Sequence, residues 1–165
     1  MSSQFAKLVK GAELPRSMEA AKKFCTSLCK DYGYTIEFDD AWNNFGRDGE
    51  ICACAGETIV CSRFRKWNYD LLVFAVMHEI GHLQCDLEWA SKRTRFVREY
   101  AAWSFAIELY TKTFVQNISI KLARFMMSNL NSYLPDYNDS VHTSEGIKEG
   151  EHAFWCPLKS RVIRD

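Results

Sequence analysis

The residues with the clearest capacity for chemistry are two histidines that flank a glutamate. They form the stretch His78-Glu79-Ile80-Gly81-His82, which has the spacing H-E-x-x-H and continues an apolar run from Leu71. Histidines four residues apart lie on the same face of a helix, so both imidazoles can reach one metal ion. Imidazole is an ordinary zinc ligand, and a catalytic zinc site takes three protein ligands and leaves one position for water. The spacing therefore predicts a Zn²⁺ site that includes His78 and His82.

Glu79 has the position of a general base. It follows the first histidine directly, so its side chain projects beside the metal rather than onto it. There it can take a proton from zinc-bound water, whose pKa the metal lowers to roughly 7, and hydroxide then attacks a polarised carbonyl. The alternative is a chance H-E-x-x-H with exposed histidines. These histidines, however, continue a buried apolar helix, in which an unpaired imidazole is costly.

The third ligand has more than one candidate among the acidic residues downstream. A metzincin continues as H-E-x-x-H-x-x-G-x-x-H, and this chain has Cys85 in place of the glycine and Glu88 at the last position. A helix does not turn easily there without glycine, which disfavours Glu88. Asp86 fits better as a cap at the end of the helix, or as a residue that contacts a metal ligand without binding the metal itself.

Glu99 is the preferred third ligand. On the helix expected after residue 94, it shares one side with Ala102, Trp103 and Ala106. Small residues on this side, together with Gly81, would let two helices approach until a carboxylate reaches the metal of its neighbour. A capping or solvent-facing glutamate is the alternative.

The two motifs together resemble the ImmA/IrrE group of zinc metallopeptidases. The resemblance covers roughly residues 17–115 and includes the second helix, which reads Glu-x-x-Ala-x-x-Phe-Ala-x-Glu-Leu from Glu99 to Leu109. It implies a zincin-like fold with His78, His82 and Glu99 on zinc and Glu79 as general base. It also implies intracellular protein substrates, frequently helix-turn-helix repressors.

Three departures from the family pattern concern the substrate cleft. Many relatives have a second acidic residue where this chain has Ala101, and Asn or Asp where it has Trp103. The Leu-Met-Pro that often ends their second helix is replaced by Leu109-Tyr110-Thr111. The metal ligands are unaffected by these departures.

The sequence also predicts the elements that must position these residues. We expect an α+β fold in one domain, residues 1–165, with a small β-sheet packed on the active-site helix and the glutamate-bearing helix. Helical spacing of apolar residues, alternation and turn residues define each element. We expect helices at Ser17–Tyr32 (capped by Gly33), 71–83 (capped by Asn68 or Asp70), Thr94–Val115 and Ser119–Leu134, and a β-meander of strands Tyr34–Phe38, Ile51–Cys54 and Thr58–Cys61.

Composition limits the classes of function. Hydrophobic residues make up 47% of the 165, which excludes an intrinsically disordered chain. The net charge is zero, which argues against a general affinity for nucleic acid or anionic membranes. The longest apolar run, Leu71 to Met77, is far shorter than the roughly 20 residues that span a bilayer. The start of the sequence has no apolar signal segment, so we expect a cytoplasmic protein with reduced thiols.

Other chemically capable residues are weaker candidates. Cys52, Cys54 and Cys61 match a structural zinc site poorly and fit small buried thiols better. Cys25 and Cys29, one helical turn apart, should face the core. Four residues are candidates for stabilising the transition state, and the sequence does not rank them: Tyr100, His142, His152 and Arg98. Basic residues flank the active-site helix and fit a solvated loop or a docking surface: Arg63, Arg65, Lys66, Lys92, Arg93, Arg95 and Arg98.

The leading functional hypothesis is a zinc-dependent metalloendopeptidase that cleaves an intracellular protein, with a helix-turn-helix repressor as a candidate substrate. The alternative is a non-proteolytic, zinc-stabilised regulatory or binding module on the same scaffold. A weaker third hypothesis, a DNA-associated metalloprotease, comes from the basic residues, although no direct nucleic-acid contact is expected. The sequence leaves the oligomeric state open.

Overall fold

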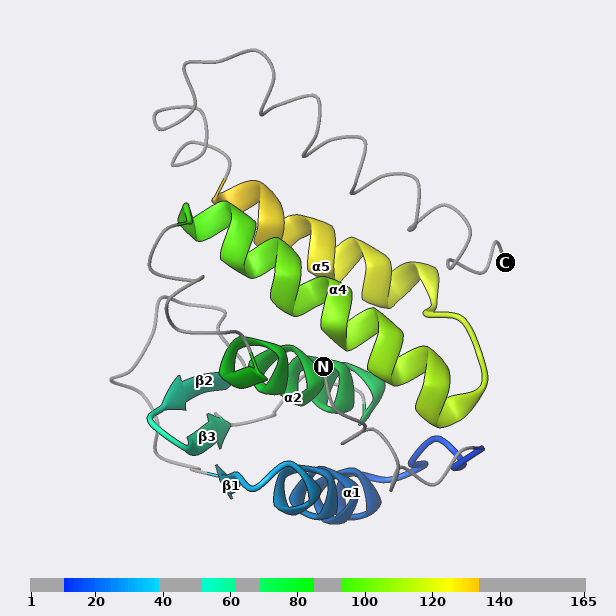
Figure 1. The fold of residues 1–165 in the computed structure, drawn as a ribbon. Helices are drawn as coiled ribbons and strands as arrows, with labels where there is room; N and C mark the ends of the chain where they lie inside the picture. The colour runs from blue at the N-terminus through cyan, green and yellow to red at the C-terminus, as the bar shows by residue number, and fades with distance from the viewer. Residues whose placement is uncertain (1–10, 39–51, 62–68, 85–92, 134–165) are drawn as a thin grey trace.

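The computed structural model describes residues 11–38, 52–61, 69–84 and 93–133 (Figure 1). The described chain has an α+β architecture of helices packed beside one small sheet, as predicted. Its elements are α1 (Met18–Asp31), β1 (Thr35–Phe38), β2 (Cys52–Ala55), β3 (Thr58–Cys61), α2 (Tyr69–Gln84), α4 (Arg95–Phe114) and α5 (Ile120–Ser132).

Three helices begin after a hydroxyl side chain that caps the first turn, which confirms their predicted starts. The backbone N–H groups of Ala20, Val97 and Leu122 donate to the side-chain oxygens of Ser17, Thr94 and Ser119. Such caps satisfy amide groups that the helix itself leaves without partners. Of the two caps expected for α2, Asp70 lies inside the first turn, and Asn68 lies outside the described residues.

The residues next to the C-terminal end of α1 also determine where this helix ends. Gly33 follows the cap residue Tyr32 with a φ of +81°, a backbone conformation that suits glycine. The chain then turns directly into β1. The Tyr34 hydroxyl donates to the Leu83 carbonyl at 3.1 Å and so ties the start of β1 to the end of α2.

The sheet is mixed, with the strand order β1-β3-β2. β2 and β3 pair antiparallel across a tight turn, as expected, with Cys52 opposite Cys61 and Gly56 at a φ of +63°. The expected meander is wrong, because β1 pairs parallel with β3, with Thr35 opposite Thr58. Alternation within a strand determines which faces are buried but not which strand lies alongside, and that choice depends on tertiary packing.

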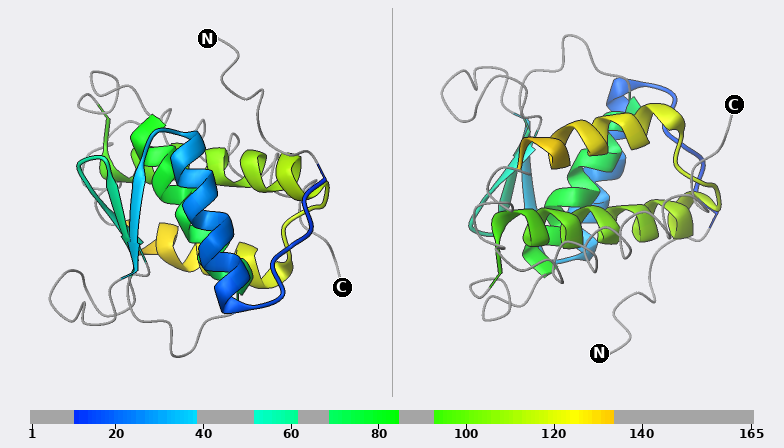
Figure 2. Two further views of the ribbon diagram at one scale, coloured as in Figure 1. Left: turned by 90° about the horizontal axis from the view of Figure 1, so that it is seen from below. Right: turned by 90° about the horizontal axis from the view of Figure 1, so that it is seen from above.

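α2 is the central helix of the described chain. It contacts α1, β2, α4 and α5, and it lies between α1 with the sheet on one side and α4 with α5 on the other (Figure 1). Viewed from below, α1 lies in front of α2 (Figure 2). Every residue from Leu71 to Gly81 is buried, as expected for a segment that is apolar on all sides. Nevertheless, none of the helices in the described ranges combines the length and the apolar character needed to cross a membrane.

The crossing of α2 over α4 is unusually close. A Cβ atom built on Gly81 would lie 2.7 Å from the backbone oxygen of Ala102 and 2.9 Å from its Cα atom. Real side chains do not tolerate such contacts with backbone, so only glycine fits this position. The predicted close approach through small residues is therefore confirmed, and it places the N-terminal half of α4 against the histidine-bearing end of α2.

Gly81→Ala tests this crossing. Alanine favours a helix by about 1 kcal/mol over glycine, so a helix free of contacts would gain stability. Because the added methyl group meets backbone, we expect a net loss of about 1–3 kcal/mol in the free energy of unfolding, measured by urea denaturation. Ser27→Ala, at an exposed position in α1, serves as the control and should stay within about 0.5 kcal/mol of the wild type. A Gly81→Ala variant as stable as the wild type would contradict the close crossing.

Candidate metal centre

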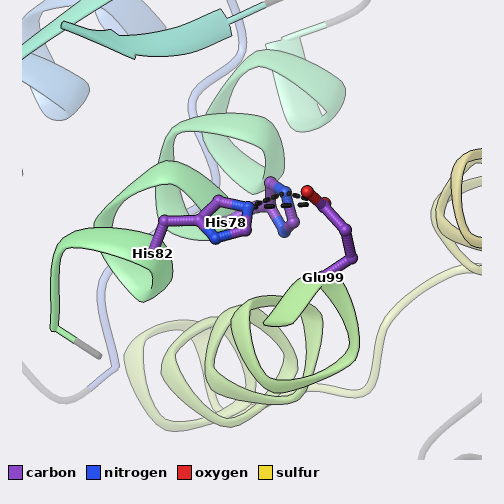
Figure 3. Close-up of side chains that lie close together, drawn as sticks. All are labelled: His78, His82 and Glu99. Carbon is purple, nitrogen blue, oxygen red and sulfur yellow. Dashed lines mark hydrogen bonds and ion pairs between the residues drawn. The ribbon is translucent and has the colours of Figure 1, made fainter. Parts of the chain in front are cut away.

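The structure brings His78, His82 and Glu99 together into a group that could hold a metal ion (Figure 3). The two histidines come from neighbouring turns of α2, and Glu99 reaches across from α4. The Oε2 atom of Glu99 lies 3.2 Å from Nε2 of His78 and 3.3 Å from Nε2 of His82. The two Nε2 atoms are 3.1 Å apart.

These spacings fit the edges of a tetrahedral metal site. Ligand atoms at about 2.0–2.1 Å from a zinc ion in tetrahedral geometry lie about 3.3–3.4 Å from one another. The three observed separations, 3.1, 3.2 and 3.3 Å, are close to that value. Two imidazole nitrogens and one carboxylate oxygen also form a donor set found in catalytic zinc sites. The residues present therefore fit a zinc ion.

The group is buried on one side and more open on the other. The side chain of His78 is 8% exposed and that of Glu99 is 13% exposed, whereas His82 is 26% exposed. Access from solvent is therefore greatest at His82. A metal held by three protein ligands keeps a free position for water or substrate.

The protonation of Glu99 and of His78 suits metal binding. Burial raises the pKa of Glu99, but hydrogen bonds from His78 and His82 outweigh that effect and lower it from 4.5 to about 2. Burial lowers the pKa of His78 from 6.5 to about 4, against the opposing effect of Glu99. At neutral pH Glu99 is thus a carboxylate and His78 a neutral imidazole, the states in which these side chains bind metals.

His82 has the opposite balance. Burial lowers its pKa, but the hydrogen bond to Glu99 and the charges of Glu99 and Glu79 raise it, and the net shift is upward. Arg98 acts weakly against this shift, so its charge also lies near His82. The Glu99 carboxylate thus favours a positive charge at this point of the site, and a bound metal cation could supply it in place of a proton on His82.

Glu79 is buried beside the metal group and is not one of its three members. Its charge influences His82 on one side and the Cys52 thiol of β2 on the other, where burial is the larger cause of a raised pKa. Glu79 therefore lies next to this group rather than in it. The role of general base stays a prediction.

Trp103 is a neighbour of the site that the sequence did not assign to it. Trp103 is only 3% exposed and belongs to the core. Its ring also stacks on the imidazole of His78, with ring centroids 3.8 Å apart and an angle of 23° between the planes. The signal was present in the spacing, because a residue four positions after Glu99 lies on the same face of the helix.

Several other candidates lie outside the described residues: Cys85, Asp86, Glu88, His142 and His152, and the basic residues Arg63, Arg65, Lys66 and Lys92. Among the described ones, Arg98 is exposed and Tyr100 is partly buried against the core. Arg95 is exposed and lies over the ring of Tyr133, with 4.8 Å from its guanidinium carbon to the ring centroid.

Four cysteines form a buried group of free thiols, as expected for small core residues. Cys25 and Cys29 of α1 face the core, and Cys52 and Cys61 meet across the hairpin with their Sγ atoms 3.0 Å apart. Burial raises the pKa of Cys29 to about 12. Within the four described ranges, the cysteines do not form a group close enough to hold a metal, and the side chain of Cys54 is not described.

Removal of a ligand should abolish tight metal binding. Loss of a group that merely supports a ligand costs about 10–100-fold in metal affinity, so His78→Ala and Glu99→Ala should each cost at least about 100-fold. We expect about one zinc per wild-type chain by elemental analysis and almost none in either variant. Glu108→Ala is the matched control, because Glu108 is on the same helix but exposed and paired with Lys112. Equal zinc content in all four proteins would exclude this site.

Metal binding should also stabilise the fold. A ligand that binds only the folded state adds about 2.7 kcal/mol when its free concentration is 100 times its Kd. A chelator should therefore lower the Tm of the wild type, and added zinc should restore it. The Glu99→Ala variant should show no such shift, whereas Glu108→Ala should behave like the wild type. Thermal unfolding followed by circular dichroism measures all three.

The case for a function rests on the geometry of the His78, His82 and Glu99 group. No family model, curated protein or solved structure matches the chain. The resemblance of the two helical motifs to ImmA/IrrE peptidases therefore stays a prediction from the sequence.

Proposed function

We propose that the protein is a zinc-dependent metallopeptidase in which His78, His82 and Glu99 hold the metal and Glu79 acts as general base. The observation that carries this proposal is the convergence of three donor atoms from two helices at separations of 3.1–3.3 Å. A zincin-like fold of the ImmA/IrrE type is part of the same proposal and is supported by the order of the two motifs.

Zinc is the metal that suits this donor set best. Imidazole and carboxylate together are the ligands of many catalytic zinc sites, while Mg²⁺ and Ca²⁺ favour sites made of oxygen alone. Structural zinc sites are usually closed by four protein ligands. A group of three, with one member partly exposed, supports a catalytic role instead.

The chemistry divides between the metal and Glu79. Bound zinc supplies Lewis acidity, which polarises a carbonyl group and lowers the pKa of water. The Glu79 carboxylate accepts a proton from the attacking water and then delivers it to the leaving amine, as a base and acid in turn. Its position directly after His78 in α2 fixes the carboxylate beside the metal throughout.

The proposed substrate is a protein, and the proposed reaction is the hydrolysis of one of its peptide bonds. The similarity of the helical motifs to ImmA/IrrE peptidases supports an intracellular protein substrate, with helix-turn-helix repressors as the first to test. A cytoplasmic location is consistent with the buried free thiols Cys25, Cys29, Cys52 and Cys61.

Glu79→Gln separates metal binding from catalysis. The amide has nearly the same shape but cannot accept the proton, so hydrolysis should fall by about 10²–10⁴-fold while zinc content remains that of the wild type. Cleavage of a candidate repressor or an unfolded protein substrate, followed by mass spectrometry of the fragments, measures the rate. Glu108→Gln is the matched control on α4 and should retain full activity.

The same variant tests the alternative function. A non-proteolytic zinc-stabilised module would bind its partner without producing fragments, and Glu79→Gln would keep that activity. The observation that supports this alternative is Trp103, which replaces the Asn or Asp of many ImmA/IrrE peptidases and stacks on the proposed metal ligand His78. Full cleavage by zinc-loaded Glu79→Gln would overturn the role of Glu79.

A further inference from the structure

We propose that Trp103 is the positioning residue for His78: its indole face sets the plane of the imidazole so that Nε2 points at the metal position. This inference rests on the proposed metal site and deepens it. The two rings are 3.8 Å apart between centroids and only 23° from parallel, which is a stacked arrangement. His78 is also the less exposed of the two histidines.

The indole is itself held in place on more than one side. Phe74 of α2 lies 5.3 Å from it at 38°, and Phe125 of α5 lies 5.8 Å away at 84°, an edge-on contact. The edge-on contact is one of the favoured geometries of aromatic pairs, and the Phe74 contact is tilted. Three helices therefore define the plane of the Trp103 ring, and the imidazole stacked on it takes the same orientation.

The usual device for orienting such a histidine is missing from the described chain. A metal-binding imidazole normally donates its second ring N–H to a carboxylate, a carbonyl or water. The Nδ1 atom of His78 is buried and has no hydrogen-bond partner among the described residues. A ring without that bond can rotate about its Cβ–Cγ axis unless packing prevents it. Among the described residues, the stack with Trp103 is the ring-on-ring packing that opposes this rotation.

The polar atom of Trp103 plays no part in this role. Its Nε1 atom is buried and, within the described ranges, also lacks a hydrogen-bond partner. The contribution of Trp103 to His78 must then come from the flat face of its ring. This predicts that phenylalanine can replace tryptophan, whereas a side chain without an aromatic face, such as leucine or methionine, cannot.

One helix thus supplies both a ligand and the support for another ligand. Glu99 and Trp103 lie one turn apart on the same face of α4, the first beside the two Nε2 atoms and the second against the His78 ring. The contact of Gly81 with Ala102, which lies between them in sequence, fixes their distance from α2. A change at Trp103 should therefore alter the metal site without loss of any ligand.

The chain contains a matched control for ordinary packing. Tyr110 is seven residues further along α4, is as buried as Trp103, and contacts Phe74 and Phe114. None of its described contacts is to a metal ligand. Loss of its ring should weaken the core as much as loss of Trp103 and leave the metal site unchanged.

The experiment compares Trp103→Leu, Trp103→Met, Trp103→Phe and Tyr110→Leu in the full chain. The zinc Kd is measured by competition with a chelator, the visible absorption of the cobalt form reports ligand geometry, and the Tm of the metal-free form reports packing. We expect Trp103→Leu and Trp103→Met to raise the Kd about 10–100-fold and to shift the cobalt bands. Trp103→Phe should change the Kd by less than about tenfold, and Tyr110→Leu should lower only the Tm.

Three results would overturn the inference: a folded Trp103→Leu or Trp103→Met with the Kd and cobalt spectrum of the wild type, an equal rise in Kd for Tyr110→Leu, or a rise for Trp103→Phe as large as for Trp103→Leu. Methionine is flexible and adapts to irregular gaps but has no aromatic face, so it keeps the test valid if the leucine variant does not fold. These measurements need no substrate. A wild type that binds zinc but cleaves nothing would overturn the proposed peptidase activity alone, and one that binds no zinc would overturn both.

Discussion

The metal group depends on the backbone contact between α2 and α4. The position of Gly81, with no room for a Cβ atom beside Ala102, allows the two helices to lie closer than ordinary side chains permit. At that separation a glutamate side chain on α4 spans the distance to both histidines. Wider spacing would leave the buried imidazole of His78 without its carboxylate partner, which is costly in an apolar interior. The crossing therefore links the packing of the core to the composition of the site.

The apolar surroundings and the polar group are mutually dependent. α2 is buried along most of its length, and such a helix normally excludes charged residues. The fold nevertheless encloses His78, Glu79 and Glu99, and hydrogen bonds between Glu99 and the imidazoles hold the glutamate ionised despite its burial. A buried carboxylate beside two imidazole nitrogens favours a cation at the centre of the group, because little water is present to solvate the negative charge.

Local patterns accounted for most of the secondary structure. Ser17, Thr94 and Ser119 cap the helices that they were expected to begin, and Gly33 ends α1, because capping and turn preferences act within a few residues. The position of β1 in the sheet could not be obtained in this way. Its parallel pairing with β3 joins segments separated by residues 39–57, and no short-range pattern encodes such a neighbour.

The candidate site, too, has features that short-range patterns predict and features that depend on tertiary packing. The sequence by itself determined that His78 and His82 lie on one helix face with Glu79 beside them, because a spacing of four residues has this consequence in any α-helix. It favoured Glu99 among several carboxylates through the small residues that follow it. Only the tertiary structure decided that Glu99 reaches both imidazoles and that the Trp103 ring stacks on His78. Contacts between helices depend on their separation and rotation, which the packing of the whole core determines and the spacing within one helix does not.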